Sequence, residues 1–145
     1  MLMLLAVQFL LGMDVNLFGT FPETSDVLQA LESSTDPALT VHMAVAFILL
    51  ALAIAVAVLA FRRPLPRKVS WIAVGGVLGV LWAFESGIEF VLSGFSNNAA
   101  SFSMAAGFLA AVVIYGYLGL LTALNSGDRF AAHLVAEPRP DLRSR

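Results

Sequence analysis

The chain has 145 residues, of which 59% are hydrophobic and only 12% are charged. Soluble domains carry about 25% charged residues, and the mean hydropathy here is +0.88, so the composition indicates a protein that lies in the lipid bilayer. There is no cysteine, which excludes disulfides, thiolate metal ligands and cysteine nucleophiles. The net charge of -2 and the lack of a basic patch give no sign of a nucleic-acid partner.

Four apolar segments are long enough to cross about 30 Å of hydrocarbon as helices. We expect an all-α protein, an antiparallel bundle of four transmembrane helices within residues 1–124, because the connections are too short for any other order. A basic cytoplasmic tail, 125–145, follows. The expected spans are residues 2–21, 38–61, 70–93 and 100–124.

Several helix boundaries carry their own signals. Asp36-Pro37 is an N-cap followed by proline at the first helical position, and Gly94 is placed to end the third span. Gly75 and Gly79 form a small-xxx-small pair, which lets two helices approach closely in lipid.

All eight basic residues lie in the second connection and in the tail, whereas the first connection is acidic. The positive-inside rule therefore predicts that both termini and residues 62–69 are cytoplasmic, with residues 22–37 and 94–99 outside. The alternative is that the first span is a cleaved signal peptide, but this segment has no basic n-region and no A-x-A cleavage site.

Polar residues inside the spans gather at one depth. Counting 1.5 Å per residue from the outer helix ends puts Asp14, His42, Glu85 and Glu89 within about 6 to 13 Å of that side. Asn16 lies at a similar depth, and Glu85 and Glu89 share one face of the third helix. The pattern predicts one acidic pocket that opens outward, formed by these five residues.

Three carboxylates cannot all stay charged in a medium of low dielectric without a cation nearby. We expect some to be protonated, hydrogen-bonded to His42, or neutralised by a bound ion. The alternative is that Asp14 and Glu89 reach water and that Glu85 only stabilises helix packing. Intramembrane ionisable residues are nevertheless a functional hypothesis by default.

His42 and Met104 lie at matched depths on the second and fourth spans, which would be diagonal in a bundle built in chain order. A histidine and a methionine are a known axial pair for haem iron. This arrangement weakly resembles one half of haem A synthase, although that family uses paired histidines and the resemblance here reaches His42 alone. No cofactor is predicted; haem b or a divalent cation is the alternative.

The whole chain resembles small four-helix membrane proteins of actinobacterial type. The likeness rests on QFLLGMDVNLFGTFP at residues 8–22, the helix of His42, Gly87-x-x-Phe90 and Ser103-Met104-x-x-Gly107. It implies a four-helix fold in a bacterial cytoplasmic membrane, and it implies no reaction.

The common catalytic motifs, such as G-x-S-x-G and H-E-x-x-H, do not occur. We therefore expect a non-enzymatic accessory subunit or binding bundle, with the lipid bilayer, other membrane subunits or a second copy as partners. The alternatives are a haem or metal protein and a proton- or cation-coupled carrier.

Overall fold

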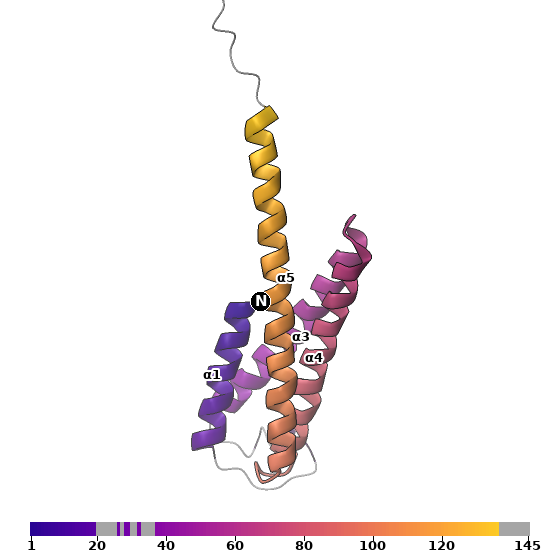
Figure 1. The fold of residues 1–145 in the computed structure, drawn as a ribbon. Helices are drawn as coiled ribbons and strands as arrows, with labels where there is room; N and C mark the ends of the chain where they lie inside the picture. The colour runs from indigo at the N-terminus through magenta and orange to yellow at the C-terminus, as the bar shows by residue number, and fades with distance from the viewer. Residues whose placement is uncertain (20–25, 27, 30–31, 33–36, 137–145) are drawn as a thin grey trace, which may run out of the picture.

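The chain folds into helices alone wherever its structure is described. The computed structural model describes residues 1–19, 26, 28–29, 32 and 37–136, with side chains as far as Leu124, and this part contains no strand. Three helices are long and apolar enough to cross a membrane, and a shorter apolar helix precedes them (Figure 1). They are α1 (Leu2–Phe18), α3 (Pro37–Arg62), α4 (Arg67–Leu92) and α5 (Asn98–Ala136).

Helix α1 is shorter than the segment 2–21 expected from hydropathy. It ends at Phe18 because Gly19 takes an extended conformation, with φ -74° and ψ 139°. Its 17 residues span about 25 Å at 1.5 Å per residue. Residues 20 and 21, and the proposed cap at Asp36, lie outside the described residues.

Helix α4 ends in a Schellman motif that the glycine at residue 94 makes possible. Gly94 has φ 59°, its N–H donates to the carbonyl of Val91, and the N–H of Phe95 donates to the carbonyl of Phe90. The rings of Phe90 and Phe95 then pack edge to face, 4.9 Å apart, which is the hydrophobic contact typical of this motif. Phe95 itself has φ 64°, so the chain reverses within a few residues.

Asn97 caps the start of α5. Its Oδ1 accepts a hydrogen bond from the backbone N–H of Ala100 at 3.1 Å, which satisfies one of the free donors at a helix N-terminus. Its Nδ2 donates to Oε1 of Glu89 at 2.9 Å. The turn is therefore tied to the last part of α4.

Helices α4 and α5 make the most extensive contact in the bundle, and glycine allows it. A methyl group on Gly107 would lie 2.7 Å from the backbone nitrogen of Ala83 and 3.0 Å from the carbonyl oxygen of Gly79. Backbone therefore meets backbone at this crossing. Gly79 and Gly75 both face α5 as expected, Gly75 in ordinary contact with Ile114, and the neighbouring Gly76 packs more closely, against Tyr115.

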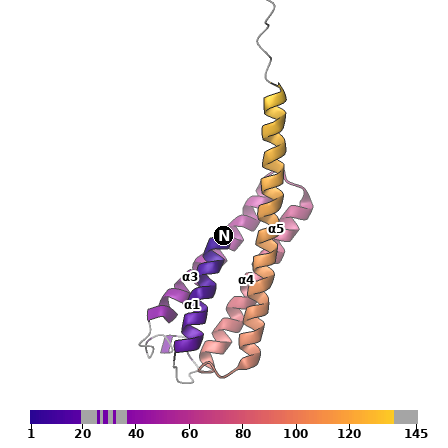
Figure 2. The same cartoon turned by 60° about the vertical axis from the view of Figure 1, so that its left-hand side comes forward.

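The other strong contacts join α1 to α3 and α3 to α4, whereas α1 meets α5 only briefly (Figure 2). Two clusters of buried side chains result. The larger one joins all four helices and includes Leu5, Ala53, Val80 and Tyr115. The buried side chains of the smaller one are Val15, Leu39, Met43 and Val91.

Helix α5 projects past the other helices (Figure 1) and continues to Ala136. The sequence pattern placed the end of the span at residue 124 and a tail after it. No proline occurs between Leu124 and Ala136, so nothing in the backbone chemistry forces the helix to stop there.

Candidate functional site

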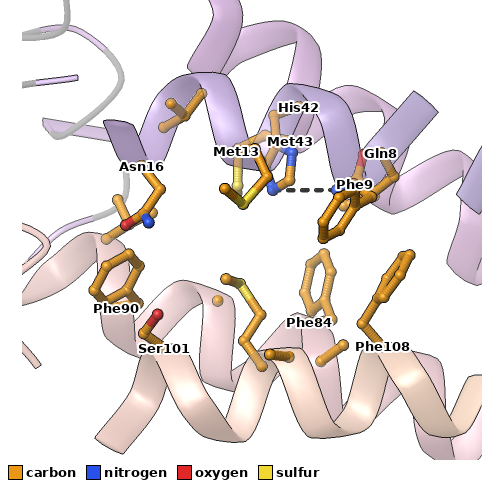
Figure 3. A pocket seen from close by; sticks show the side chains of 18 of the residues that line it. Gln8, Phe9, Met13, Asn16, His42, Met43, Phe84, Phe90, Ser101 and Phe108 are labelled. Carbon is orange, nitrogen blue, oxygen red and sulfur yellow. Dashed lines mark hydrogen bonds between the residues drawn. The ribbon is translucent and has the colours of Figure 1, made fainter. Parts of the chain in front are cut away.

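A cavity of about 370 Å³ lies among the four helices. Its walls come from residues 5–16 of α1, 39–49 of α3, 80–91 of α4 and 101–111 of α5. Figure 3 shows the side chains of α1 and α3 on one side of the cavity and those of α4 and α5 on the other. The cavity has the size of small-molecule sites, which begin at roughly 300 Å³.

Eight of the 26 lining residues are phenylalanine or methionine, and most of the others are small or aliphatic. A methionine side chain is flexible and polarisable, and it packs well against rings. The phenylalanines and methionines that line the cavity are Phe9, Phe84, Phe90, Phe95, Phe108, Met13, Met43 and Met104.

Two polar side chains meet inside the cavity wall. Gln8 on α1 and His42 on α3 approach to 3.2 Å between Nε2 of the amide and Nε2 of the ring (Figure 3). Gly12 makes this possible, because a methyl group at residue 12 would lie 2.9 Å from Cε1 of His42. The ring is therefore held against the backbone of α1.

This pair leaves two buried polar atoms without a partner in the described part of the chain. They are Oε1 of Gln8, whose side chain is only 8% exposed, and Nδ1 of His42. Exchanging the oxygen and nitrogen of the amide would change which atom donates, but one amide atom and one ring nitrogen would still be left over. Buried polar atoms without a hydrogen bond are costly, and since both atoms have no accessible surface, this cost belongs to the packing of α1 against α3.

The cavity has a second polar place, where Asn16 of α1 and Ser101 of α5 lie (Figure 3). Asn16 is exposed and Ser101 is half-buried. Since Asn16 is eight residues from Gln8, the two polar places are about 12 Å apart along α1.

The three carboxylates of the expected acidic pocket are elsewhere. Asp14, Glu85 and Glu89 are exposed, and none of them lines the cavity. Successive helical residues are 100° apart, and α4 turns Phe84 and Gly87 toward the cavity, so Glu85 and Glu89 fall on the opposite side. Of the five predicted residues, the structure therefore places His42 and Asn16 at the cavity and the three carboxylates outside its lining.

Other polar residues of this layer also have roles between helices. Ser103 of α5 accepts a hydrogen bond from the indole of Trp82 at 2.7 Å and bonds to the hydroxyl of Ser86 at 2.9 Å. These bonds join α4 to α5, and none of the three residues lines the cavity.

Gln8 is the site residue that sequence reasoning did not include. Its depth, about 15 Å from the end of α1 at Phe18, separated it from the outer polar layer. A signal was present: Gln8 is buried with Leu5 and Val15 on one face of α1, a spacing of three and seven residues that marks the packed side of a helix.

Met104 lines the same cavity as His42, from the opposite wall. Its sulfur would lie 3.3 Å from a methyl group on Gly87, so a glycine leaves room for this side chain as well. Among the described residues, no three His, Asp or Glu side chains are grouped to hold a metal ion.

Comparison of the chain with protein-family profiles, with curated proteins and with solved structures gave no match.

Proposed function

We propose that this protein is a small binding bundle of the bacterial cytoplasmic membrane that holds an apolar molecule with a polar group in its intramembrane cavity. It acts alone or as an accessory subunit of a larger membrane complex. The observation that carries the proposal is the cavity itself: a largely apolar space whose lining includes flexible methionine and aromatic side chains, with the polar residues Gln8, Asn16, His42 and Ser101 among them.

The proposed topology is a four-pass antiparallel bundle with both termini in the cytoplasm. It is supported by the confinement of Lys and Arg to residues 62–68 and to the tail. The cavity uses most of α1, the later half of α4 and the earlier halves of α3 and α5, as expected when α3, α4 and α5 alternate in direction. In this arrangement the cavity lies in the outer half of the membrane.

The five methionines provide a test. Met13, Met43 and Met104 line the cavity, whereas Met1 and Met3 do not. With ¹³C-labelled methionine methyl groups in lipid nanodiscs, titration with decylbenzene should shift the three cavity signals saturably and leave those of Met1 and Met3 in place. Equal, unsaturable shifts at all five methyl groups would show that the probe only dissolves in the surrounding lipid, and the proposal would be wrong.

A matched pair of variants sharpens this experiment. Ala46 lines the cavity, and Ala55 lies on the same helix with its side chain exposed. Ala46→Phe should fill the cavity and abolish the saturable shifts, whereas Ala55→Phe should leave them unchanged.

Haem binding is the second candidate, and one specific observation favours it: His42 and Met104 line the same cavity from facing walls. The argument against haem binding is that Nε2 of the His42 ring is already hydrogen-bonded to the amide of Gln8. An optical spectrum of protein purified from haem-replete cells separates the two candidates. A Soret band that is lost in both His42→Ala and Met104→Leu would establish haem binding, and its absence leaves the apolar ligand.

A further inference from the structure

The turn between α3 and α4 carries half of the basic residues of the chain. Arg62, Arg63, Arg67 and Lys68 lie within seven positions, and no Asp or Glu occurs from residue 37 to residue 84. These four positive charges therefore have no acidic neighbour along either helix.

A hollow of about 460 Å³ lies at this turn, and it shares no residue with the intramembrane cavity. The turn is at the opposite end of α4 from the α4–α5 turn (Figure 1). Arg63 and Arg67 line the hollow, and apolar side chains, among them Phe61, Leu65 and Trp71, line it as well. Positive charge and apolar surface thus meet in one concave place.

We propose that this hollow binds the head group of an anionic glycerophospholipid. The phosphate lies between the guanidinium groups of Arg63 and Arg67, and the glycerol and the upper part of an acyl chain pack against Phe61 and Trp71. The site is separate from the cavity, so it does not depend on the function proposed above.

The charges of the hollow select an anionic lipid. A guanidinium group is planar and donates two parallel hydrogen bonds to a phosphate. A zwitterionic lipid also has a phosphate, but its ammonium group would come close to the positive charges of the turn and would meet no carboxylate from residues 37–84. Basic pockets between transmembrane helices are typical places for anionic head groups.

The walls of the hollow are held in place before any lipid binds. Only residues 63–66 separate α3 from α4, and two of these four are proline, Pro64 and Pro66. Proline fixes its own φ. Ser70, which is 3% exposed, donates its hydroxyl to the carbonyl of Ala60 at 3.0 Å and so ties the start of α4 to the end of α3. A preformed site loses little conformational entropy on binding.

Two aromatic rings put the hollow at the level of the lipid head groups. Phe61 and Trp71 pack edge to face with their centroids 6.1 Å apart, and they are 55% and 65% exposed, so both lie on the outer surface of the bundle. Tryptophan is enriched where a membrane meets water. Arg67 is one turn before Trp71 on the same side of α4, so a phosphate at Arg67 has its acyl chains beside the rings.

The two tryptophans of the chain allow a direct test. Trp71 lines the hollow, whereas Trp82, which is 50% exposed on the same helix, does not. In Trp82→Phe the tryptophan fluorescence comes from Trp71 alone, and bromine on an acyl chain quenches it on contact. In lipid nanodiscs we compare brominated phosphatidylglycerol with brominated phosphatidylcholine at equal mole fraction. We expect an association constant about tenfold higher for phosphatidylglycerol, which corresponds to about 1.4 kcal/mol. In Trp71→Phe, the two lipids should quench Trp82 equally.

Two double variants distinguish a site from general attraction to an anionic surface. Arg63→Gln with Arg67→Gln removes two charges that line the hollow, and Arg62→Gln with Lys68→Gln removes two charges of the same turn that do not. In the Trp82→Phe background, the first pair should reduce the preference for phosphatidylglycerol to less than about twofold, and the second should keep most of it. Unchanged helical circular dichroism shows that both are folded.

Three results would overturn the inference. The first is an equal loss of preference in the two double variants, which is the behaviour of a basic segment that is attracted to the membrane without a site. The second is the lack of any preference in Trp82→Phe itself. The third comes from replacing chloride with inorganic phosphate at constant ionic strength: if this abolishes the preference, the hollow binds the free ion, whereas an unchanged preference supports the lipid. Decylbenzene binding in the cavity is measured separately, so this inference and the proposed function fail independently.

Discussion

The amide of Gln8 on α1 and the imidazole of His42 on α3 meet at 3.2 Å, although the two residues are 34 positions apart in the chain. A hydrogen bond between buried groups is favourable chiefly because each group is costly without the other. We expect Gln8→Leu and His42→Leu each to lower the free energy of unfolding by about 1–3 kcal/mol, and the double variant to lose less than the sum. A double-mutant cycle in mixed detergent micelles measures the coupling; strictly additive losses would show that the two residues do not interact.

Gly12 should be intolerant of even one methyl group. In Gly12→Ala the added carbon would lie 2.9 Å from the His42 ring, so the ring must shift and its bond to Gln8 must break. We expect a loss of about 1–3 kcal/mol in unfolding free energy, the range for overpacked sites. Gly116→Ala is the matched control, because nothing lies within 4 Å of that position; a similar loss in both variants would mean that helix α1 does not pack on His42 as described.

The crossing of α4 and α5 should tolerate an added methyl group even less well than the contact at Gly12 does. An alanine side chain at Gly107 would meet backbone atoms of Ala83 and Gly79, and backbone cannot rotate away as a side chain can. Gly107→Ala should therefore lower the unfolding free energy by about 3 kcal/mol or more, whereas Gly119→Ala, which faces open space, should not. Thermal unfolding of the two variants in the same detergent provides the comparison, and equal stability would contradict this close contact.

Substitution of Glu85 should leave the affinity for the cavity probe unchanged. Glu85 is exposed and lies outside the cavity lining, so Glu85→Gln should change probe binding by less than about twofold, within the ±0.5 kcal/mol usual for remote surface substitutions. The methionine-methyl titration measures this directly. A tenfold loss of binding in this variant would restore the acidic pocket expected from the sequence.

The topology is testable with reporters. A fusion after Arg145 should report the cytoplasm and one near Ser33 the exterior, because every Lys and Arg lies in the second connection and the tail. An external C-terminus would reverse the side of the membrane on which the cavity lies, and it would leave the cavity chemistry unchanged.

The sequence by itself determined the class of protein and much of the local structure. Composition and long apolar runs predicted an all-helical membrane protein, and the helices of the structure agree with it. Gly94 predicted where α4 ends, because helix caps depend on conformational preferences and hydrogen bonds within a few residues.

Only the tertiary structure decided which polar residues share a site. Depth along a helix follows from residue counting, and it groups Glu85 with His42; direction around the helix depends on which faces pack together. In lipid, polarity does not decide which helix faces pack together. Small residues such as Gly79 and Gly107 allow helices to approach closely, while many large apolar side chains stay on the outer surface. The pairing of Gln8 with His42 therefore came from helix packing, which no pattern within one helix predicts.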